Sequence, residues 1–213
     1  MVSRILKSGF LPFRNMSYSV LERKIKSLKV DGVSEWGDYH SRVGLYSKDG
    51  NVNLTSRMEW VVNAVKELSP ATIIELAGNQ GSLSRALSKL PDLKHVVCSD
   101  YDEKSIDQLL VRLDDKDKVH PACFDFMADI QGSLSAERAK RLKSDMVIAL
   151  AVTHHLILTQ QYSIDSIFTA LASYTNKYVI VEFMPLGLWD GKTAPPLPDW
   201  YNESWFVENM TRY

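Results

Sequence analysis

Between residues 56 and 183, short apolar runs alternate with longer amphipathic stretches, and this alternation constrains the fold more than any other feature. Five runs have the composition of buried strands: 73–77, 95–99, 119–124, 146–152 and 178–183. Helical periodicity predicts helices at 56–68, 82–90, 103–113 and 163–174. Strands that alternate with helices form a parallel sheet with right-handed crossovers. We therefore predict an α/β, Rossmann-like fold with strand order 3-2-1-4-5 and helices on both faces of the sheet.

The overall composition favours a reducing compartment. Lys and Arg total 25 and Asp and Glu total 26, so the chain as a whole has no net attraction for nucleic acid. Cys98 and Cys123 both fall in predicted buried strands, which favours reduced core cysteines over a disulfide. No apolar run is long enough to span a membrane. We expect a cytoplasmic protein.

Charge is distributed unevenly, because the N-terminal segment is strongly basic. The bases that precede Val30 are opposed by the single acid Glu22: Arg4, Lys7, Arg14, Arg23, Lys24, Lys26 and Lys29. The stretch SVLERKIKSLKV has the periodicity of an amphipathic helix. Two interpretations stay open. The helix docks on the domain with a solvated basic face, or it contacts an anionic partner such as the inner membrane face or an acidic glycan.

The stretch that follows the first predicted strand has the composition of a ligand-binding turn. The strand ends near Glu75, and Gly78, Asn79 and Gly81 supply small or left-handed-tolerant residues before a helix begins at Ser82. Free amide groups at such a helix start face the ligand. The G-x-G-x-x-G pattern of dinucleotide sites and the Gly-Lys-Ser/Thr ending of a P-loop are both absent. The remaining candidate is S-adenosylmethionine, which has no phosphate and needs only close backbone approach.

The same stretch, IIELAGNQGSLS, resembles the first motif of class I S-adenosylmethionine-dependent methyltransferases. The usual acid-x-Gly-x-Gly-x-Gly appears here as Glu75-Leu-Ala77-Gly-Asn79-Gln-Gly81, so Ala77 and Asn79 replace two glycines. The Ala77 methyl is tolerable if φ is negative there, and Asn accepts the left-handed region. The resemblance implies that Glu75, Ala77, Gly78, Asn79 and Gly81 bind the cofactor.

The end of the second predicted strand carries an acid with the spacing of a ribose ligand. Asp100 lies 19 residues beyond Gly81, where a carboxylate accepts hydrogen bonds from ribose hydroxyls. Tyr101 is placed to cover the adenine face. The alternative role for Asp100 is to cap the next helix, but Asp102 can fill that role instead.

The third and fourth predicted strands add further cofactor candidates. The resemblance implies an acid near the adenine amino group at the end of the third strand. Asp125 fits that position, with Phe126 as an apolar wall and Asp129 as a less favoured alternative. Leu150, in the fourth run, is the last residue that we expect to bind the cofactor.

Histidines are the candidate catalytic residues. His154 and His155 follow the fourth run, where the resemblance places groups that face the substrate. A hydroxyl nucleophile must lose a proton, and His is the usual base near neutral pH. The alternative is that one ring braces the following helix. His40, in the segment VSEWGDYHS, is a further candidate base, and Tyr39 beside it is a candidate substrate ligand. This segment is either a cofactor lid or a surface loop that Trp36 anchors in the core.

Two features near the fifth strand concern the acceptor. Glu182, in VIVEFMP, either binds substrate hydroxyls or terminates the strand. The aromatic and proline-rich stretch LGLWDGKTAPPLPDWYNESWF suits an acceptor wall as well as a satellite core. The tetrapeptide Asn-Pro-Pro-Tyr, which many methylases of base or amide nitrogen carry after the fourth strand, is replaced here by ALAVTHHL. That replacement argues against methylation of nucleobase amino groups.

These patterns favour a methyltransferase that transfers a methyl group from S-adenosylmethionine to a hydroxyl of a small-molecule or carbohydrate-type acceptor. The segments WGDYH, ALAVTHHL and VEFMP resemble bacterial methyltransferases associated with nodulation factors and surface glycans. The alternatives are an RNA or protein methyltransferase and a non-catalytic methyltransferase-like binding module. We expect residues 1–54 to form a basic and aromatic segment with the lid and residues 55–213 to form the cofactor-binding domain. No metal site is predicted.

The C-terminal part is too short for the usual end of this fold. Only 30 residues follow Phe183, whereas a helix and an antiparallel hairpin need roughly 35 or more. The stretch NESWFVENMTRY predicts a helix capped by Asn202 or Ser204. We therefore expect a sheet without that hairpin and with an exposed fifth strand. A second copy, the N-terminal segment or another part of a multidomain parent protein would cover the exposed edge.

Overall fold

The computed structural model describes residues 17–27, 34, 36–114, 116–128 and 133–213. The chain divides into two compact units, Met1–Gly32 and Val33–Tyr213. The first contains helix α2 (Tyr18–Ser27), on which Arg23 and Lys24 are exposed, so the predicted basic helix is present. Residues 33–54, which the sequence analysis groups with the N-terminal segment, lie in the same compact unit as the sheet. Within the described residues, no helix combines the length and the apolar character that crossing a membrane requires.

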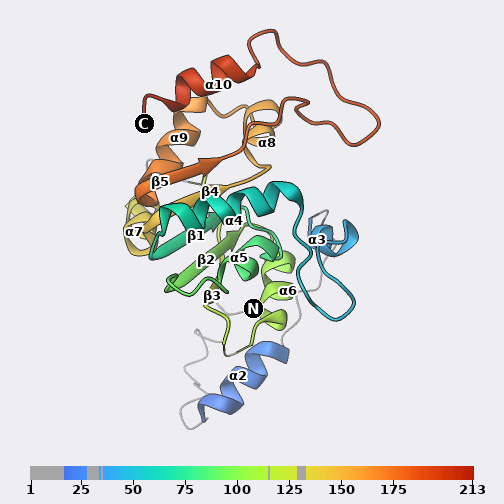
Figure 1. Cartoon of the computed structure of the whole chain (residues 1–213), viewed down its shortest axis with the longest axis vertical. Coiled ribbons are helices and arrows are strands. Elements are labelled where there is room, and N and C mark those ends of the chain that lie inside the picture. The colour runs from blue at the N-terminus through green and yellow to red at the C-terminus, as the bar shows by residue number, and fades with distance from the viewer. Residues whose placement is uncertain (1–16, 28–33, 35, 115, 129–132) are drawn as a thin grey trace, which may run out of the picture. The chain divides into compact units, whose positions relative to one another are not determined.

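The second unit is built on a parallel sheet in the order β3-β2-β1-β4-β5, which confirms the predicted topology (Figure 1). Its strands are β1 (Thr72–Leu76), β2 (His95–Asp100), β3 (Val119–Cys123), β4 (Ser144–Ala149) and β5 (Thr175–Val181). At the centre, Ile74 of β1 pairs with Val97 on one side and with Val147 on the other. The chain order reverses between β1 and β4, so the switch point of the sheet lies between these two strands.

Helices cover both faces of the sheet, as predicted, and bury alternate residues of its strands (Figure 1). Ile73 of β1 packs in the cluster that contains the buried side of α4 (Ser56–Leu68), whereas Ile74 and Leu76 pack in the opposite cluster. The other helices of this unit are α3 (Tyr39–Arg42), α5 (Ser82–Leu87), α6 (Glu103–Arg112), α7 (Ser133–Leu142), α8 (Thr153–Leu158), α9 (Ile164–Ser173) and α10 (Glu203–Met210). Burial on both faces explains why the strands have continuous apolar sequences.

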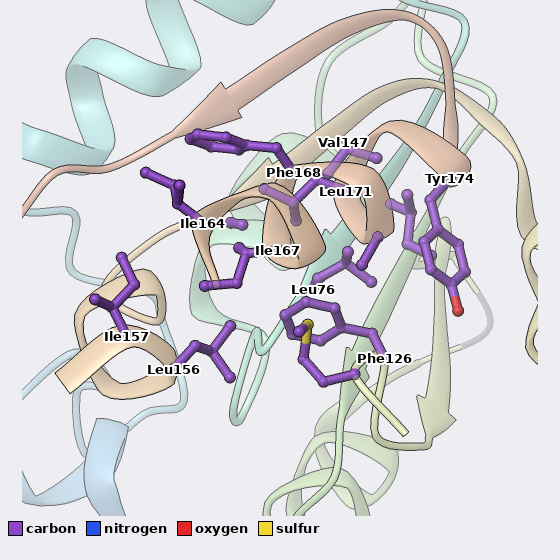
Figure 2. Close-up of a cluster of buried hydrophobic side chains, with 14 of the residues drawn as sticks. Leu76, Phe126, Val147, Leu156, Ile157, Ile164, Ile167, Phe168, Leu171 and Tyr174 are labelled. Atoms are coloured by element: carbon purple, nitrogen blue, oxygen red, sulfur yellow. The ribbon is translucent and has the colours of Figure 1, made fainter. Parts of the chain in front are cut away.

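The larger hydrophobic cluster fixes the helices that follow β4 (Figure 2). Leu156 of α8 and Phe168 of α9 pack with Leu76 and Val147 of the sheet. Phe126 belongs to the same cluster. Because α8 is held by this core, the residues at its start have defined positions at the end of β4.

Several sequence-based expectations need correction. The fourth apolar run was predicted to be a strand to residue 152, but β4 ends at Ala149, and α8 begins at Thr153. Cys98 is buried as expected, whereas Cys123 is exposed at the end of β3; both cysteines are free. Helices α3 and α7 were not predicted.

The region after β5 contains α10 and no further strand in residues 184–213, which confirms the expected five-stranded sheet. Asn202 caps this helix, since its side chain accepts a hydrogen bond from the Trp205 backbone N–H at 3.0 Å. Phe206 of α10 packs on Phe168 of α9, with ring centroids 5.4 Å apart. Val179 is exposed on β5. What covers the outer edge of β5 stays a prediction.

Candidate active site

The turn after β1, residues 77–81 (the cofactor turn), is built from left-handed backbone. Ala77, Asn79 and Gly81 have φ angles of 55°, 50° and 67°. The expectation that φ is negative at Ala77 is therefore wrong. The backbone of Ala77 is left-handed, a conformation that costs about 1–2 kcal/mol for a residue other than glycine. Asn79 takes the left-handed region as expected, because its short polar side chain tolerates it.

The two glycines of the turn are required by close packing. A Cβ atom at Gly78 would lie 2.7 Å from Cys98 Sγ, and one at Gly81 would lie 2.7 Å from Leu109 Cδ1. Both distances are shorter than any real contact allows, so β2 and α6 pack directly against the backbone of the turn. The turn thus has little freedom to move without disturbing the core.

Glu75 braces the helix that follows the turn. Its carboxylate is buried and accepts hydrogen bonds from the Ser84 N–H, at 3.0 Å, and from the Ser84 hydroxyl. Burial raises the pKa of Glu75 to about 7, and the Ser84 bonds oppose that rise. The side chain therefore stabilises α5, and its direct contact with a cofactor stays a prediction.

Asp100 stands at the end of β2 beside the turn. One carboxylate oxygen accepts a bond from the Asn79 N–H at 2.8 Å, and the other accepts one from the Asp102 N–H at 2.9 Å. Burial raises the pKa of Asp100. Asp102 caps α6 by accepting from the backbone N–H groups of Lys104 and Ser105, as expected. Each oxygen of Asp100 keeps a second acceptor position, so the group can still accept from ribose hydroxyls.

The remaining cofactor candidates lie in different environments. Tyr101 is 59% exposed, and Leu150 is partly buried against the α4 side of the core. Asp125 is exposed, and its carboxylate accepts from the Met127 N–H at 2.8 Å. Phe126 is only 6% exposed, so little of its ring can meet a cofactor. Asp129 lies outside the described residues, and the cofactor roles of this set stay predictions.

The turn fits S-adenosylmethionine in the groups that it presents. The side-chain oxygen of Asn79 is buried and has no hydrogen-bond partner among the described residues. It is an acceptor beside Asp100, at the place where the spacing predicts ribose hydroxyls. Three left-handed residues also bring the backbone to the ligand side without a phosphate-binding lysine. Asn79 and Asp100 are therefore the residues of this chain that fit the cofactor best.

Residues 36–46, which we name the lid segment, lie against the cofactor turn. Trp36 O accepts from the Asn79 side-chain amide at 2.9 Å, and the Ser41 N–H donates to Gln80 Oε1 at 3.1 Å. The Tyr46 hydroxyl donates to the backbone oxygen of Gln80. The segment WGDYH is therefore packed on the cofactor turn.

The lid segment carries one candidate histidine and contacts the pair that the other two form. His40 is buried, and its Nδ1 lies 3.1 Å from the Ser82 hydroxyl at the start of α5. His155 is 4.1 Å from the neighbouring His154 ring and 5.4 Å from the Trp36 ring, measured between centroids. Tyr39 packs against Trp36 at 5.6 Å. The lid segment thus carries His40 at the start of α5 and contacts the His154–His155 pair through Trp36.

Electrostatics keep two of these rings neutral. Burial lowers the pKa of His40 and of His154 to about 4. The charges of Arg112 and Arg57 lower the pKa of His40 further, and those of His155 and Arg57 lower the pKa of His154 further. His154 Nδ1 is buried without a hydrogen-bond partner among the described residues. A neutral imidazole with an unpaired nitrogen can accept a proton or a hydrogen bond from a ligand.

Arg57 is the functional candidate that sequence reasoning missed. Its guanidinium forms an ion pair with Glu182 at 3.0 Å, across the ends of α4 and β5. Glu182 also accepts from the Ala151 N–H at 2.8 Å, and its backbone oxygen accepts from the Thr153 hydroxyl at 2.9 Å. Glu182 therefore fixes the loop after β4, and its contact with substrate stays a prediction. The only available signal for Arg57 was its place in the first turn of a helix that precedes β1.

A pocket adjoins this ion pair. Its volume is about 260 Å³, and its lining combines the ion pair with apolar side chains: Arg57, Trp60, Val61, Leu150, Ile180, Val181, Glu182 and Phe183. Trp60 is 66% exposed at this place. The pocket offers a carboxylate, a guanidinium and two aromatic side chains to a small ligand.

Comparisons with solved structures agree with the fold. The methyltransferase domain of bacterial CtHen1-CN is 19% identical to this chain at a TM-score of 0.54, over 74% of this chain and 83% of the other. EvdMO1 is 12% identical at a TM-score of 0.55, over 92% and 42%. WbdD, solved with the kinase inhibitor LY294002, is 16% identical at a TM-score of 0.50, over 80% and 38%. No protein-family model and no curated protein sequence matches this chain.

The chain has the class I methyltransferase fold. At these identities the likeness concerns the fold, and the chain spans less than half of EvdMO1 and of WbdD. Proteins with this fold usually use S-adenosylmethionine. In this methyltransferase fold the ligands bind beyond the carboxyl ends of the strands at the switch point. The cofactor turn follows β1 and the histidine pair follows β4, so both lie at that point.

Proposed function

We propose that this chain is a methyltransferase that transfers the methyl group of S-adenosylmethionine to a hydroxyl of a small-molecule or carbohydrate-type acceptor. One observation carries the proposal. His154 is a buried, neutral imidazole at the end of β4, and its Nδ1 has no partner among the described residues. Leaving such a group unpaired costs free energy unless a ligand pairs with it. An acceptor hydroxyl is a ligand that would do so.

The residues would divide the work as follows. Asn79 and Asp100 hold the cofactor, which supplies an electrophilic methyl carbon on a sulfonium when bound. The acceptor oxygen forms the new C–O bond while the S–C bond breaks, and the electron pair of that bond stays on sulfur. The acceptor proton moves to His154. The protein contributes mainly by placing the hydroxyl in line with the methyl group.

The low pKa of His154 limits how much this residue can accelerate methyl transfer as a general base. At pH 7 the ring is neutral and ready to accept, but a pKa of about 4 provides little driving force for full proton removal. We therefore expect a contribution near the lower end of the range for general bases, about 10²-fold. Orientation of the hydroxyl by the imidazole accounts for part of that factor.

The pocket beside Arg57 and Glu182 supports the acceptor class. A volume of about 260 Å³ accommodates one ring with its substituents. Apolar walls suit the faces of such a ring, and the charged pair can accept from and donate to its hydroxyls. Trp60 offers an exposed aromatic surface of the kind on which sugar rings stack.

Two measurements test the proposal. Calorimetry should detect S-adenosylmethionine binding by the intact chain, and the absence of binding would refute the cofactor. Incubation with methyl-labelled cofactor and fractionated cell extract should then place the label on hydroxyl-bearing small molecules or glycans as base-stable ethers. Label found only on RNA or on protein would favour the alternative substrates. Cofactor binding without transfer to any fraction would favour a non-catalytic module.

A further inference from the structure

Two side chains of the cofactor turn hold the lid segment. The Asn79 amide donates to the Trp36 backbone oxygen at 2.9 Å and to the Ser105 hydroxyl at 3.0 Å. The Gln80 amide donates to the backbone oxygen of Gly37, and its oxygen accepts from the Ser41 N–H and hydroxyl at 3.1 and 2.9 Å. These bonds join residues that are about forty positions apart in the sequence.

Because these hydrogen bonds are buried, they contribute strongly to holding the lid segment against the turn. Gln80 is 0% exposed and Asn79 is 7% exposed. If the segment left the turn, the side-chain amides of Asn79 and Gln80 would lose their hydrogen bonds to it. Water could replace these bonds only after the site had opened, so the departure costs free energy. The ion pair of Lys104 with Asp38, at 3.1 Å, is largely exposed and holds the same segment more weakly.

The docked segment also places groups of the candidate active site. His40 contacts Ser82, and residues 37 and 41, on either side of it, are bound by Gln80. Trp36, whose backbone oxygen is bound by Asn79, packs against His155. The segment thus runs from the turn after β1 to the histidine pair after β4.

Asn79 stands where the resembling motif has glycine, and this replacement has a specific consequence. Glycine would satisfy the left-handed backbone at this position equally well. The asparagine side chain, unlike the hydrogen atom of glycine, adds a bond to the lid segment. The departure from the glycine pattern therefore adds a contact and leaves the turn conformation unchanged.

We propose that Asn79 and Gln80 are positioning residues that form a latch. The latch keeps the lid segment closed over the cofactor turn, positions Trp36 beside His155 and His40 beside Ser82, and limits the rate at which S-adenosylmethionine and its product exchange. The exchange part rests on the proposed function, whereas the latch itself is a property of the chain alone.

Hydrogen exchange on the full chain without ligand tests the latch. In Asn79→Gly, the lid amides, Ser41 among them, should exchange roughly tenfold faster, the effect expected from one lost buried hydrogen bond. The β1 amides should be unchanged. Gln80→Ala should act in the same direction. Lys104→Met, which removes the ion pair with Asp38 but keeps the aliphatic side chain that packs on Gly37, should change lid exchange less than about twofold.

Ala77→Gly is a second control, because it restores the other motif glycine without touching the lid segment. Asn79→Asp covers the case in which Gln80→Ala fails to fold, since it keeps the side-chain volume but removes the donor to Trp36. Unchanged lid exchange in Asn79→Gly and Asn79→Asp would overturn the proposal. Equal acceleration in the lid and in β1 would also overturn it, because it would reveal general destabilisation.

Ligand exchange tests the functional part separately. The dissociation rate of S-adenosylhomocysteine, followed by stopped-flow tryptophan fluorescence, should rise about tenfold in Gln80→Ala, which removes latch bonds and keeps the Asn79 side chain. An unchanged rate with faster lid exchange would overturn the gating role. Absence of any ligand binding by the unaltered chain would refute the proposed function, while the hydrogen-exchange result would still decide the latch.

Discussion

The edge of the sheet that carries the strand ends has two regions, and they differ in how fully their buried groups are paired. At the end of β1 and β2, Glu75, Gln80 and Asp100 have protein partners for nearly every polar atom. At the end of β4, the buried Nδ1 of His154 has none among the described residues. The first region is held in place by its own bonds and leaves unpaired the side-chain oxygen of Asn79, whereas the second leaves unpaired the ring nitrogen of a histidine. That difference separates a binding platform from a candidate reactive group.

The largest expected effect comes from breaking the packing of the first region. Gly81→Ala would place a methyl group 2.7 Å from Leu109 in a left-handed backbone, so we expect a loss of about 2–5 kcal/mol in the free energy of unfolding. Urea denaturation measures it. Gly50→Ala is the matched control, because Gly50 has a similar φ of 75° but no atom within 4 Å of the added methyl. Equal losses would show that backbone strain alone, not packing, makes Gly81 necessary.

The contrast between the regions also explains what sequence reasoning could find. Packed strands and helices have local patterns, so α4 matches its predicted range 56–68 and the strand order is as expected. The predicted end of the fourth strand was wrong, because residues 150–152 continue the apolar run after β4 has ended. Ala151 takes a φ of 49° there, and its N–H donates to Glu182.

Long-range polar contacts were beyond prediction for a different reason. Arg57 and Glu182 are 125 positions apart, and nothing near either residue signals their ion pair. Gln80 occupies a variable position of the motif, so only the folded chain shows that it binds the lid segment. The histidines were found because their chemistry is recognisable by residue type, whereas their neutral state follows from burial that the sequence does not display.

The second prediction tests the unpaired group directly. His154→Asn should lower turnover about 10²-fold with cofactor affinity nearly unchanged, because the imidazole serves the acceptor hydroxyl. Steady-state kinetics and calorimetry measure the two quantities. His120→Asn, at an exposed position on β3, is the control and should leave both unchanged. If His155→Asn has the larger effect, the two histidines exchange roles; full activity in both variants would make His40 the next candidate.

The third prediction returns to the binding platform. Asp100→Asn should weaken S-adenosylmethionine binding by about 1.5–3 kcal/mol, the usual contribution of a hydrogen bond to a charged group. Calorimetry at constant pH gives the value. Asp102→Asn changes the same charge two residues away but keeps a good helix cap, so its affinity should stay within about twofold. Equal losses in the two variants would mean that net charge, and not the position at the end of β2, governs binding.

The smallest expected effect concerns the pH dependence of stability, which has opposite signs for His154 and Glu75. His154 has a folded-state pKa of about 4 against the ordinary histidine value of 6.5, so the unfolded chain binds more protons between these values. Its contribution to stability is complete above pH 6.5 and is lost as pH falls toward 4. Glu75, with a folded-state pKa of about 7 against an ordinary value of 4.5, acts oppositely and destabilises the fold as pH rises through that window.

These signs predict opposite changes in the pH dependence of stability. When the pH is lowered from 7 to 5, the free energy of unfolding should fall less in His154→Asn than in the unaltered chain. The difference between the two decreases should be roughly 1–2 kcal/mol. In Glu75→Gln, the free energy of unfolding should fall more than in the unaltered chain over the same pH interval. The substitution removes the carboxyl group whose protonation stabilises the fold on acidification. Urea denaturation at the two pH values measures both. Parallel curves for all three proteins would show that neither group is buried in the folded state, and the contrast between the paired and unpaired regions would then fail.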